Sequence, residues 1–198
     1  MPKSKLFPRK HTNPFTWCGA IICAIIAIAV IITGIVVFVG YLVIRPKVPF
    51  ISVTYAHLDR FDYDQASLLT TQVTIVVKFE NDNARAHASF YDASFIAGFH
   101  GVEIAELVAD PFDVGKNSSV ELNYLVESTP IPLGPEVGDI ADMSIKENYV
   151  TLDLKGTART RWRVWILGSV KFWLHMNCGL HFFMNGSSTD LYCSTRSK

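Results

Sequence analysis

The sequence lacks the short motifs that mark the commonest enzymes and metal sites. None of its six histidines stands in an H-E-x-x-H pattern, and its four cysteines form no C-x-x-C pair. A G-x-S-x-G elbow, a phosphate-binding P-loop and a Gly-rich dinucleotide turn are also absent. A hydrolase would need an acid, a base and a nucleophile that no motif supplies. We therefore expect no catalytic residue, no metal and no cofactor, and we expect no nucleic-acid partner.

Charged residues are scarce, at 18% of the 198 residues against 49% hydrophobic residues. Residues 18–44 contain no charged residue and no His, Asn, Gln or Pro. As a helix this block would reach about 40 Å, which exceeds the roughly 30 Å hydrocarbon core of a bilayer. A cleaved signal peptide has a shorter apolar region of about 7–15 residues. We therefore predict a transmembrane helix that acts as an uncleaved signal anchor, and we exclude a multi-span transporter, a disordered chain and a disulfide-dense mini-domain.

Basic residues indicate how the span is oriented. Residues 1–16 carry four Lys or Arg and no acidic residue, whereas residues 45–198 have a balance of −4. The positive-inside rule therefore favours a cytoplasmic N-terminus. Two N-x-S sequons, at Asn117 and Asn185, agree with this orientation, because only a translocated segment is glycosylated, although chance alone supplies about one sequon in such a sequence. We expect a basic cytoplasmic tail at 1–17, the span at 18–44, a two-proline stalk at 45–50 and an extracellular domain at 51–198.

The four cysteines fall into two pairs. Cys18 and Cys23 lie at the cytoplasmic end of the span, where thiols are candidates for palmitoylation, although a span also tolerates Cys as a small apolar residue. Asn-Gly at 185–186 predicts a two-residue type I′ hairpin turn, which pairs residues whose numbers sum to 371. Cys178 and Cys193 meet this condition, so we predict a disulfide and an oxidising compartment. The alternative is two unpaired thiols.

Beyond residue 49 the apolar residues recur with a period of two, which predicts half-buried antiparallel strands. The clearest segments are 73–79, 120–126 and 150–166. A three-residue loop at 167–169 would set Trp162 opposite Leu174. Only Pro135 to Lys146 keeps a helical spacing. We predict an antiparallel β-sandwich of about seven strands, of the fibronectin-III or immunoglobulin-like type, with one short helix.

One face of the last long segment is a candidate binding surface. Four cations alternate with its apolar residues: Lys155, Arg159, Arg161 and Arg163. Trp165, Lys171 and Trp173 flank them. We call the four cations the basic stripe. Such a stripe could meet an anionic polysaccharide or lipid headgroups. The alternative is an ordinary solvated strand face, since alternation produces such stripes.

Several short segments follow one another in a characteristic order. After the basic tail and the single span come Arg45-Pro46-Lys47, Asn81-Asp82-Asn83, Phe90-Tyr91-Asp92, residues 115–119 and the late pair Cys178 and Cys193. This order resembles the plant NDR/HIN-like family, which is named for non-race-specific disease resistance and harpin-induced proteins. The family usually has Asn-Pro-Asn and Tyr-Tyr-Asp at two of these places. Both differences preserve a turn followed by an aromatic strand.

The resemblance implies a late-embryogenesis-abundant group-two ectodomain. It also implies a non-enzymatic plasma-membrane protein that acts in defence and stress response and contacts proteins of immune signalling. Some relatives are similar to integrins in linking membrane to cell wall, but the Asn-Gly-Asp signature of that idea is Asn185-Gly186-Ser187 here. We expect Asn81 and Asn83 to form Asx turns, and Tyr91 and Asp92 to pack and hydrogen-bond within the sandwich.

A lipid- or polysaccharide-binding module at the membrane surface is the alternative function. A groove between the two sheets, rather than a filled core, would favour it. The residues expected to line such a groove are Trp162, Phe172 and Tyr124.

Overall fold

The computed structural model describes residues 14–44, 47–84, 86–164, 168–189 and 191–197. The chain divides into two compact units, residues 1–46 and 47–198. In the first unit, α1 spans Pro14–Ile44, so the apolar helix is present and begins four residues before the predicted start. Its segment Trp17–Gly40 is long and apolar enough to cross a membrane, and none of it is buried. This segment is a candidate membrane anchor.

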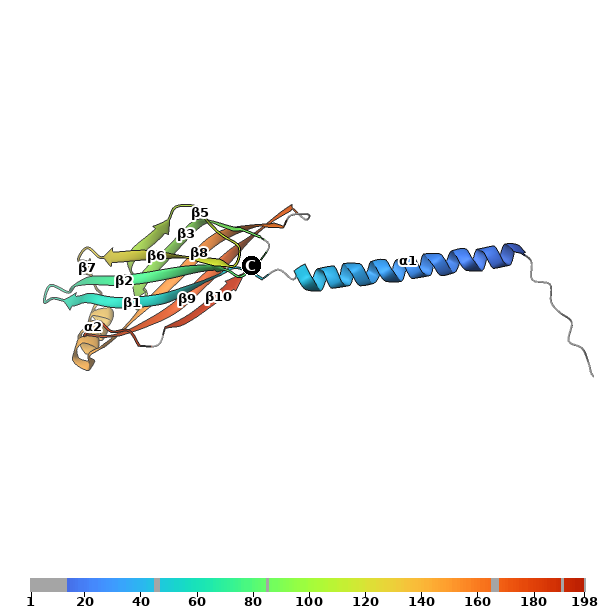
Figure 1. Ribbon diagram of the computed structural model, residues 1–198. Coiled ribbons are helices and arrows are strands. Elements are labelled where there is room, and N and C mark those ends of the chain that lie inside the picture. The colour runs from blue at the N-terminus through green and yellow to red at the C-terminus, as the bar shows by residue number, and fades with distance from the viewer. Residues whose placement is uncertain (1–13, 45–46, 85, 165–167, 190, 198) are drawn as a thin grey trace, which may run out of the picture. The chain divides into compact units, whose positions relative to one another are not determined.

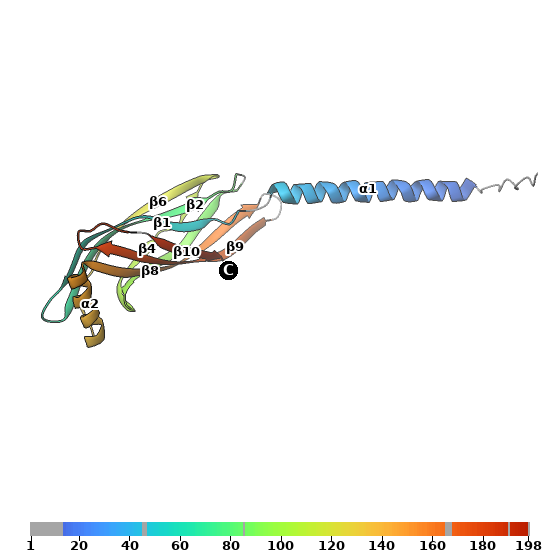
Figure 2. The ribbon, with the colours of Figure 1, turned by 90° about the horizontal axis from the view of Figure 1, so that it is seen from below.

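The described part of the second unit holds ten strands, which form two antiparallel sheets. In the four-stranded sheet the order is β1 (Phe50–Tyr63), β2 (Leu68–Asn81), β6 (Ser118–Glu127), and β7 (Ile131–Pro132) pairs with the end of β2. In the six-stranded sheet the order is β10 (Tyr192–Ser197), β9 (Gly168–Phe183), β8 (Tyr149–Val164), β3 (Ala88–Phe99), β4 (Val102–Ala109), and β5 (Phe112–Val114) pairs with β3. Figures 1 and 2 show the sheets as two layers.

A single core of apolar side chains lies between the sheets. Phe79 of β2 stands at its centre, and its ring lies edge-on to those of Phe90, Phe95 and Phe112 at centroid distances of 5.1, 6.0 and 4.9 Å. Gly156 of β8 makes room for Phe95, because a Cβ on this residue would lie 2.0 Å from the ring. The predicted β-sandwich is thus confirmed. It has ten strands rather than about seven, partly because β5 and β7 are only three and two residues long.

A helix of the sandwich also lies where the sequence places it. Helix α2 spans Pro135–Glu147, begins with Pro at its first turn and ends at Asn148, which adopts a left-handed conformation with φ of 58°. Ala141 is fully buried, and Val137 and Ile140 pack against the core. Figure 1 shows α2 at the end of the sandwich where β1 turns into β2.

The predicted pairing of β8 with β9 is wrong, although the faces are correct. Trp162 lies opposite Val170, not opposite Leu174, which pairs with Ala158. The strands pair up to Val164 and Gly168, so the connection between them falls at 165–167, outside the described residues. The shift is an even number of residues, and side chains alternate with a period of two, so every inward residue stays inward.

The structure joins Cys178 and Cys193 in a disulfide, with their Cα atoms 4.1 Å apart. The predicted type I′ turn is wrong, because of the two turn residues only Gly186 has a positive φ, of 91°. The Gly186 N–H donates to the Phe183 carbonyl, and the Phe183 N–H donates to the Ser187 carbonyl. This is a three-residue loop closed by a left-handed glycine.

Two opposite irregularities explain why the cysteines still meet. Near the loop, Phe182 bridges Ser188, so paired numbers sum to 370. Farther along, Tyr192 pairs with Gly179 and Cys193 with Cys178, so the sum is 371. A register offset of one residue between these two places compensates for the longer loop.

The disulfide closes a loop with a sequence separation of 15 residues, and we predict that its loss destabilises the sandwich by about 3 kcal/mol. Urea unfolding of the full chain in detergent micelles, followed by tryptophan fluorescence, would measure this change on addition of dithiothreitol. The Cys178→Ala/Cys193→Ala variant is the control, because its midpoint should not respond to the reductant. Equal midpoints of the oxidised and reduced protein would contradict the prediction.

Candidate binding surface on the six-stranded sheet

The outer face of the six-stranded sheet is built by residues of β3, β8 and β9 that stand side by side. Strand pairing places Tyr91, Arg159 and Trp173 in one row across the three strands. The adjacent row consists of Ser89, Arg161 and Lys171. We call these two rows the cationic rows. They join the basic stripe to the aromatic residue of the Phe90-Tyr91-Asp92 segment, which is far from the stripe in the sequence.

Arg159 lies between two aromatic rings. Its guanidinium carbon is 4.4 Å from the ring centroid of Trp173 and 5.7 Å from that of Tyr91. One of its nitrogens is 3.2 Å from the Asp92 carboxylate. These contacts orient the guanidinium and partly neutralise it. Tyr91 and Asp92 therefore act on the outer face, whereas the sequence led us to expect them within the sandwich.

A β-bulge brings Asp92 to this position. The register of β3 against β8 shifts by one residue between Tyr91 and Ser94, and Asp92 has a φ of 52°. Asp tolerates a left-handed conformation better than most residues. The extra residue turns the Asp92 side chain toward Arg159, while Phe90 and Ala93 on either side remain in the core.

Arg161 and Lys171 form a cross-strand pair of like charges. They lie directly opposite each other on β8 and β9, so two positive charges share one cross-strand pair. The Arg161 guanidinium carbon is 5.7 Å from the Tyr91 ring centroid. Among the residues that the structure describes, no carboxylate lies within ion-pair distance of either cation. A like-charged pair of this kind disfavours the folded sheet unless an anion lies between or beside the charges.

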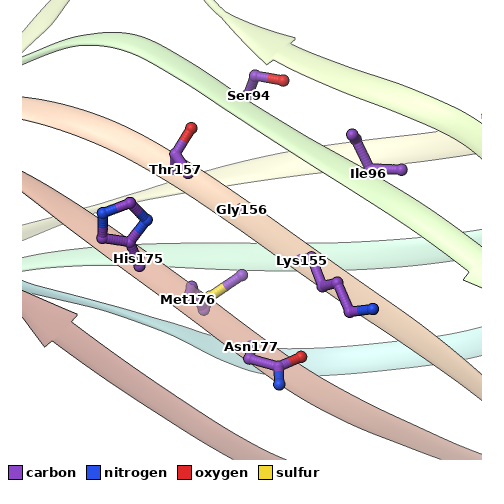
Figure 3. A pocket seen from close by; sticks show the side chains of 8 residues that line it. All are labelled: Ser94, Ile96, Lys155, Gly156, Thr157, His175, Met176 and Asn177. Carbon is purple, nitrogen blue, oxygen red and sulfur yellow. The ribbon is translucent and has the colours of Figure 1, made fainter.

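Arg163 and Lys155 continue the basic stripe in opposite directions. Arg163 belongs to β8, but its side chain is not among those described, and Trp165 lies outside the described residues. Lys155 is exposed and lines a shallow hollow of about 370 Å³ on the same face. Figure 3 shows the hollow, with side chains projecting from the three neighbouring strands β3, β8 and β9. Its lining includes Ser94, Ile96, Thr157, His175 and Asn177.

The residues expected to line a groove between the sheets belong to the core instead. Trp162 is 7% exposed, and Phe172 and Tyr124 pack against the core as half-buried side chains. The Tyr124 hydroxyl is buried, with no hydrogen-bond partner among the described residues. Burial raises the pKa of this phenol above its usual value. These three residues fill space between the sheets, so the hollow on the outer face is the better candidate site.

The side chain of Asn81 holds together the end of the sandwich at which β1 begins, which we call the stalk end. Asn81 is fully buried, and its amide donates to the carbonyls of Ala86, Val114 and Gly115 at 2.9, 3.4 and 2.9 Å. Its carbonyl accepts from the backbone N–H of Asn83 at 3.2 Å, which is the expected Asx turn. The turn is thus one of several contacts that this side chain makes.

Asn83 binds the chain just before β1. Its side-chain oxygen accepts from the Lys47 N–H at 3.0 Å, and its amide donates to the Lys47 carbonyl. The Lys47 ammonium lies 3.7 Å from Asp82. The side chain of Asn83 therefore gives the backbone of Lys47 the two hydrogen bonds that a neighbouring strand would otherwise supply. The sandwich thus begins at Lys47, before the first residue of β1, Phe50.

The modification sites proposed from the sequence lie on the surface. Asn117 is exposed, has a φ of 46° and donates its backbone N–H to the Asn83 carbonyl at 3.0 Å. Asn185 is exposed in the β9–β10 loop, and its side-chain oxygen accepts from the hydroxyl of Ser187 at 2.6 Å. Cys18 and Cys23 are free and exposed on α1. Glycosylation and palmitoylation of these residues remain predictions.

No group of three His, Cys, Asp or Glu side chains in the described segments is placed to hold a metal ion. On the four-stranded sheet, a hydrogen bond to Glu80 raises the pKa of Lys78, which lies 2.8 Å from that carboxylate. This is an ion pair between neighbouring outward residues of β2, and it is remote from the cationic rows.

The fold and the surface define a class of protein: an apolar helix that could cross a bilayer, joined to an all-β sandwich with a cationic outer face. Among proteins of known family, the chain is similar to NDR1/HIN1-like protein 12 of Arabidopsis thaliana. The two are 26% identical over 160 residues, which cover 79% of this chain and 75% of that protein. This similarity supports the resemblance to the NDR/HIN-like proteins that the order of the short segments in the sequence indicated.

Other comparisons add less. No family model matches the sequence. An X-ray structure of a structural-genomics target has 9% identity and a TM-score of 0.40, with 73% of this chain and 84% of that chain covered. A solution structure of an Arabidopsis thaliana protein has 14% identity and a TM-score of 0.32, with 77% and 82% covered. Likeness of this degree carries no weight, and the fold rests on the strand pairing described above.

We predict that Asn81→Ala destabilises the sandwich by about 3 kcal/mol, because three carbonyls lose their donor in a buried site. Urea unfolding in detergent micelles would measure the change. Asn123→Ala is the matched control, since Asn123 is exposed on β6, and its effect should stay within about 0.5 kcal/mol. A similar midpoint for the two variants would show that the Asn81 contacts contribute little.

Proposed function

We propose that this chain is a single-pass plasma-membrane protein that acts in plant defence and stress response by contacting other proteins, without catalysis. The observation that carries the proposal is the combination of one candidate membrane anchor, Trp17–Gly40, with an all-β unit of NDR/HIN-like relationship. A sandwich with a filled core offers rigid outer faces and loops, which suit recognition of a partner. Immune-signalling proteins are the partners that the family resemblance suggests.

We place the N-terminus in the cytoplasm and residues 51–198 outside the cell. The charge of +4 on residues 1–16 supports this orientation under the positive-inside rule. The Cys178–Cys193 disulfide supports it as well, because structural disulfides persist in oxidising compartments. Both sequon asparagines, Asn117 and Asn185, are exposed, so a glycan at either position would extend into solvent.

A second function is favoured by the cationic rows. Arg161 and Lys171 lack an anionic partner among the described residues, and they adjoin the exposed ring of Trp173. A module that binds lipid headgroups or cell-wall polysaccharide at the membrane surface would use such a face. This function is compatible with the first, because the opposite sheet and the loops remain available for proteins.

The orientation predicts the result of a protease-protection experiment on intact protoplasts. External protease should digest an epitope fused after residue 198 and spare an epitope fused before residue 1. Peptide N-glycosidase should reduce the apparent mass of the wild type but not that of the Asn117→Gln/Asn185→Gln variant. Protection of the C-terminal epitope, together with the absence of a glycan, would overturn the orientation.

The defence role predicts that plants without this protein are more susceptible to at least one pathogen than the wild type. The full chain should restore resistance. The Cys178→Ala/Cys193→Ala variant, whose sandwich should be less stable, should restore it less well, in proportion to its abundance at the membrane. Normal responses of the mutant plants to several pathogens and to water stress would count against the role and leave the membrane orientation untouched.

A further inference from the structure

We propose that the outer face of the six-stranded sheet binds an acidic polysaccharide, a chain of sugars with carboxylates at regular intervals. The binding residues are Arg161, Lys171 and Trp173, together with the hollow beside Lys155. This inference deepens the second proposed function, and in the plant it rests on the placement of residues 51–198 outside the cell. It commits to one of the two anionic ligands that the basic stripe suggested.

The first reason is the like-charged pair. Arg161 and Lys171 face each other across β8 and β9. Beside Arg161 stands Ser89 of β3, which is neutral, and Asp113 of β5 follows in the same row without an ion pair to either cation. Burial also leaves the Nε–H of Arg161 and the hydroxyl of Tyr91 without a hydrogen-bond partner in the described part of the chain. A sheet optimised only for stability would alternate charges here. A carboxylate beside the two cations would offset their repulsion.

The second reason is the aromatic residue in the next row. Trp173 is 37% exposed, and the Arg159 guanidinium, which Asp92 and Tyr91 orient, lies over one face of its ring. An exposed indole has an apolar face and a polar edge, which match the C–H face and the hydroxyls of a sugar ring. A small inorganic anion would make no use of this ring.

The third reason is the hollow that continues from the cationic rows. It has a volume of about 370 Å³, and its lining is mostly apolar, with Thr157, His175 and Asn177 as polar side chains that can donate or accept hydrogen bonds. The Ser94 hydroxyl at its edge already donates to the Glu106 carboxylate at 2.8 Å. Figure 3 shows these side chains around Gly156, with Lys155 at one side. Hydroxyl-rich ligands need many such groups, and sites for small ligands have volumes of roughly 300–1,000 Å³.

The distance between the two ends of the proposed binding face favours a polymer over a single sugar. Lys155 and Arg161 are six residues apart on β8, which corresponds to roughly 20 Å along a strand. One sugar cannot reach both ends, whereas a chain with repeated carboxylates can. A bilayer surface would touch the protruding cations but would not enter the hollow. The observations therefore favour an acidic polysaccharide over lipid headgroups.

The test is a binding measurement on the full chain in nanodiscs of phosphatidylcholine, with polygalacturonate as the probe. The wild type should bind polygalacturonate, and binding should weaken as ionic strength rises. Fully methyl-esterified galacturonan, which has the same backbone without the charges, should bind at least about tenfold more weakly. Equal binding of the two polymers would overturn the proposal.

The Arg161→Gln/Lys171→Gln variant should bind polygalacturonate roughly tenfold more weakly than the wild type. Arg60→Gln/Lys146→Gln is the matched control, because it removes the same charge from β1 and α2 and should change affinity less than about twofold. Circular dichroism would verify that both variants are folded. Equal affinities of the two double variants would overturn the assigned residues.

Tryptophan fluorescence supplies an independent measurement. Polygalacturonate should change the emission of the wild type, and Trp173→Phe, which keeps an aromatic ring, should abolish this change. Binding to phosphatidylserine vesicles without binding to polygalacturonate would replace the polysaccharide by a lipid surface. These experiments need no cell, so they can fail while the membrane orientation and the defence role stand, and the reverse also holds.

Discussion

The alternation of side chains along β8 is the constraint on which the rest of the molecule depends. Burial of Leu152, Leu154 and Ala158 in the core leaves Lys155 and Arg159 no choice but the outer face. The same constraint applies to β3 and β9, which flank β8. The fold therefore fixes which positions of β3, β8 and β9 face outward. It does not fix which residue types occupy these positions. Substitutions on the outer face therefore leave the side chains of the core unchanged.

This constraint explains what the sequence could predict. Periods of two and of 3.6 identify strands and helices, so the sandwich, α2 and the outward direction of the basic stripe were all accessible. The disulfide was also accessible, because Cys178 and Cys193 are close in sequence and share a hairpin. The two-residue turn from which the disulfide was predicted is wrong. The loop has three residues, and a later register offset of one residue brings the two cysteines opposite each other again.

Irregular features were not accessible in the same way. The bulge at Asp92 depends on how β3 pairs with β8, two strands that are separated by four others along the chain. Without the bulge, Tyr91 and Asp92 could not be assigned to the outer face beside Arg159. The hollow has the same origin, because its lining residues come from three strands that only the fold brings together. An aspartate between an aromatic residue and an alanine in an alternating segment is the one local signal of the bulge.

Asn81 and Asn83 give the sandwich a mechanical property. When a chain is pulled at Lys47, β1 would ordinarily peel away from β2 one residue at a time, starting at Phe50. The hydrogen bonds between Lys47 and the Asn83 side chain would bear the force first. The Asn83 amide donates to the Asn81 side chain, which is hydrogen-bonded to the segments before β3 and after β5. Tension applied at Lys47 would then be distributed over several strands at once.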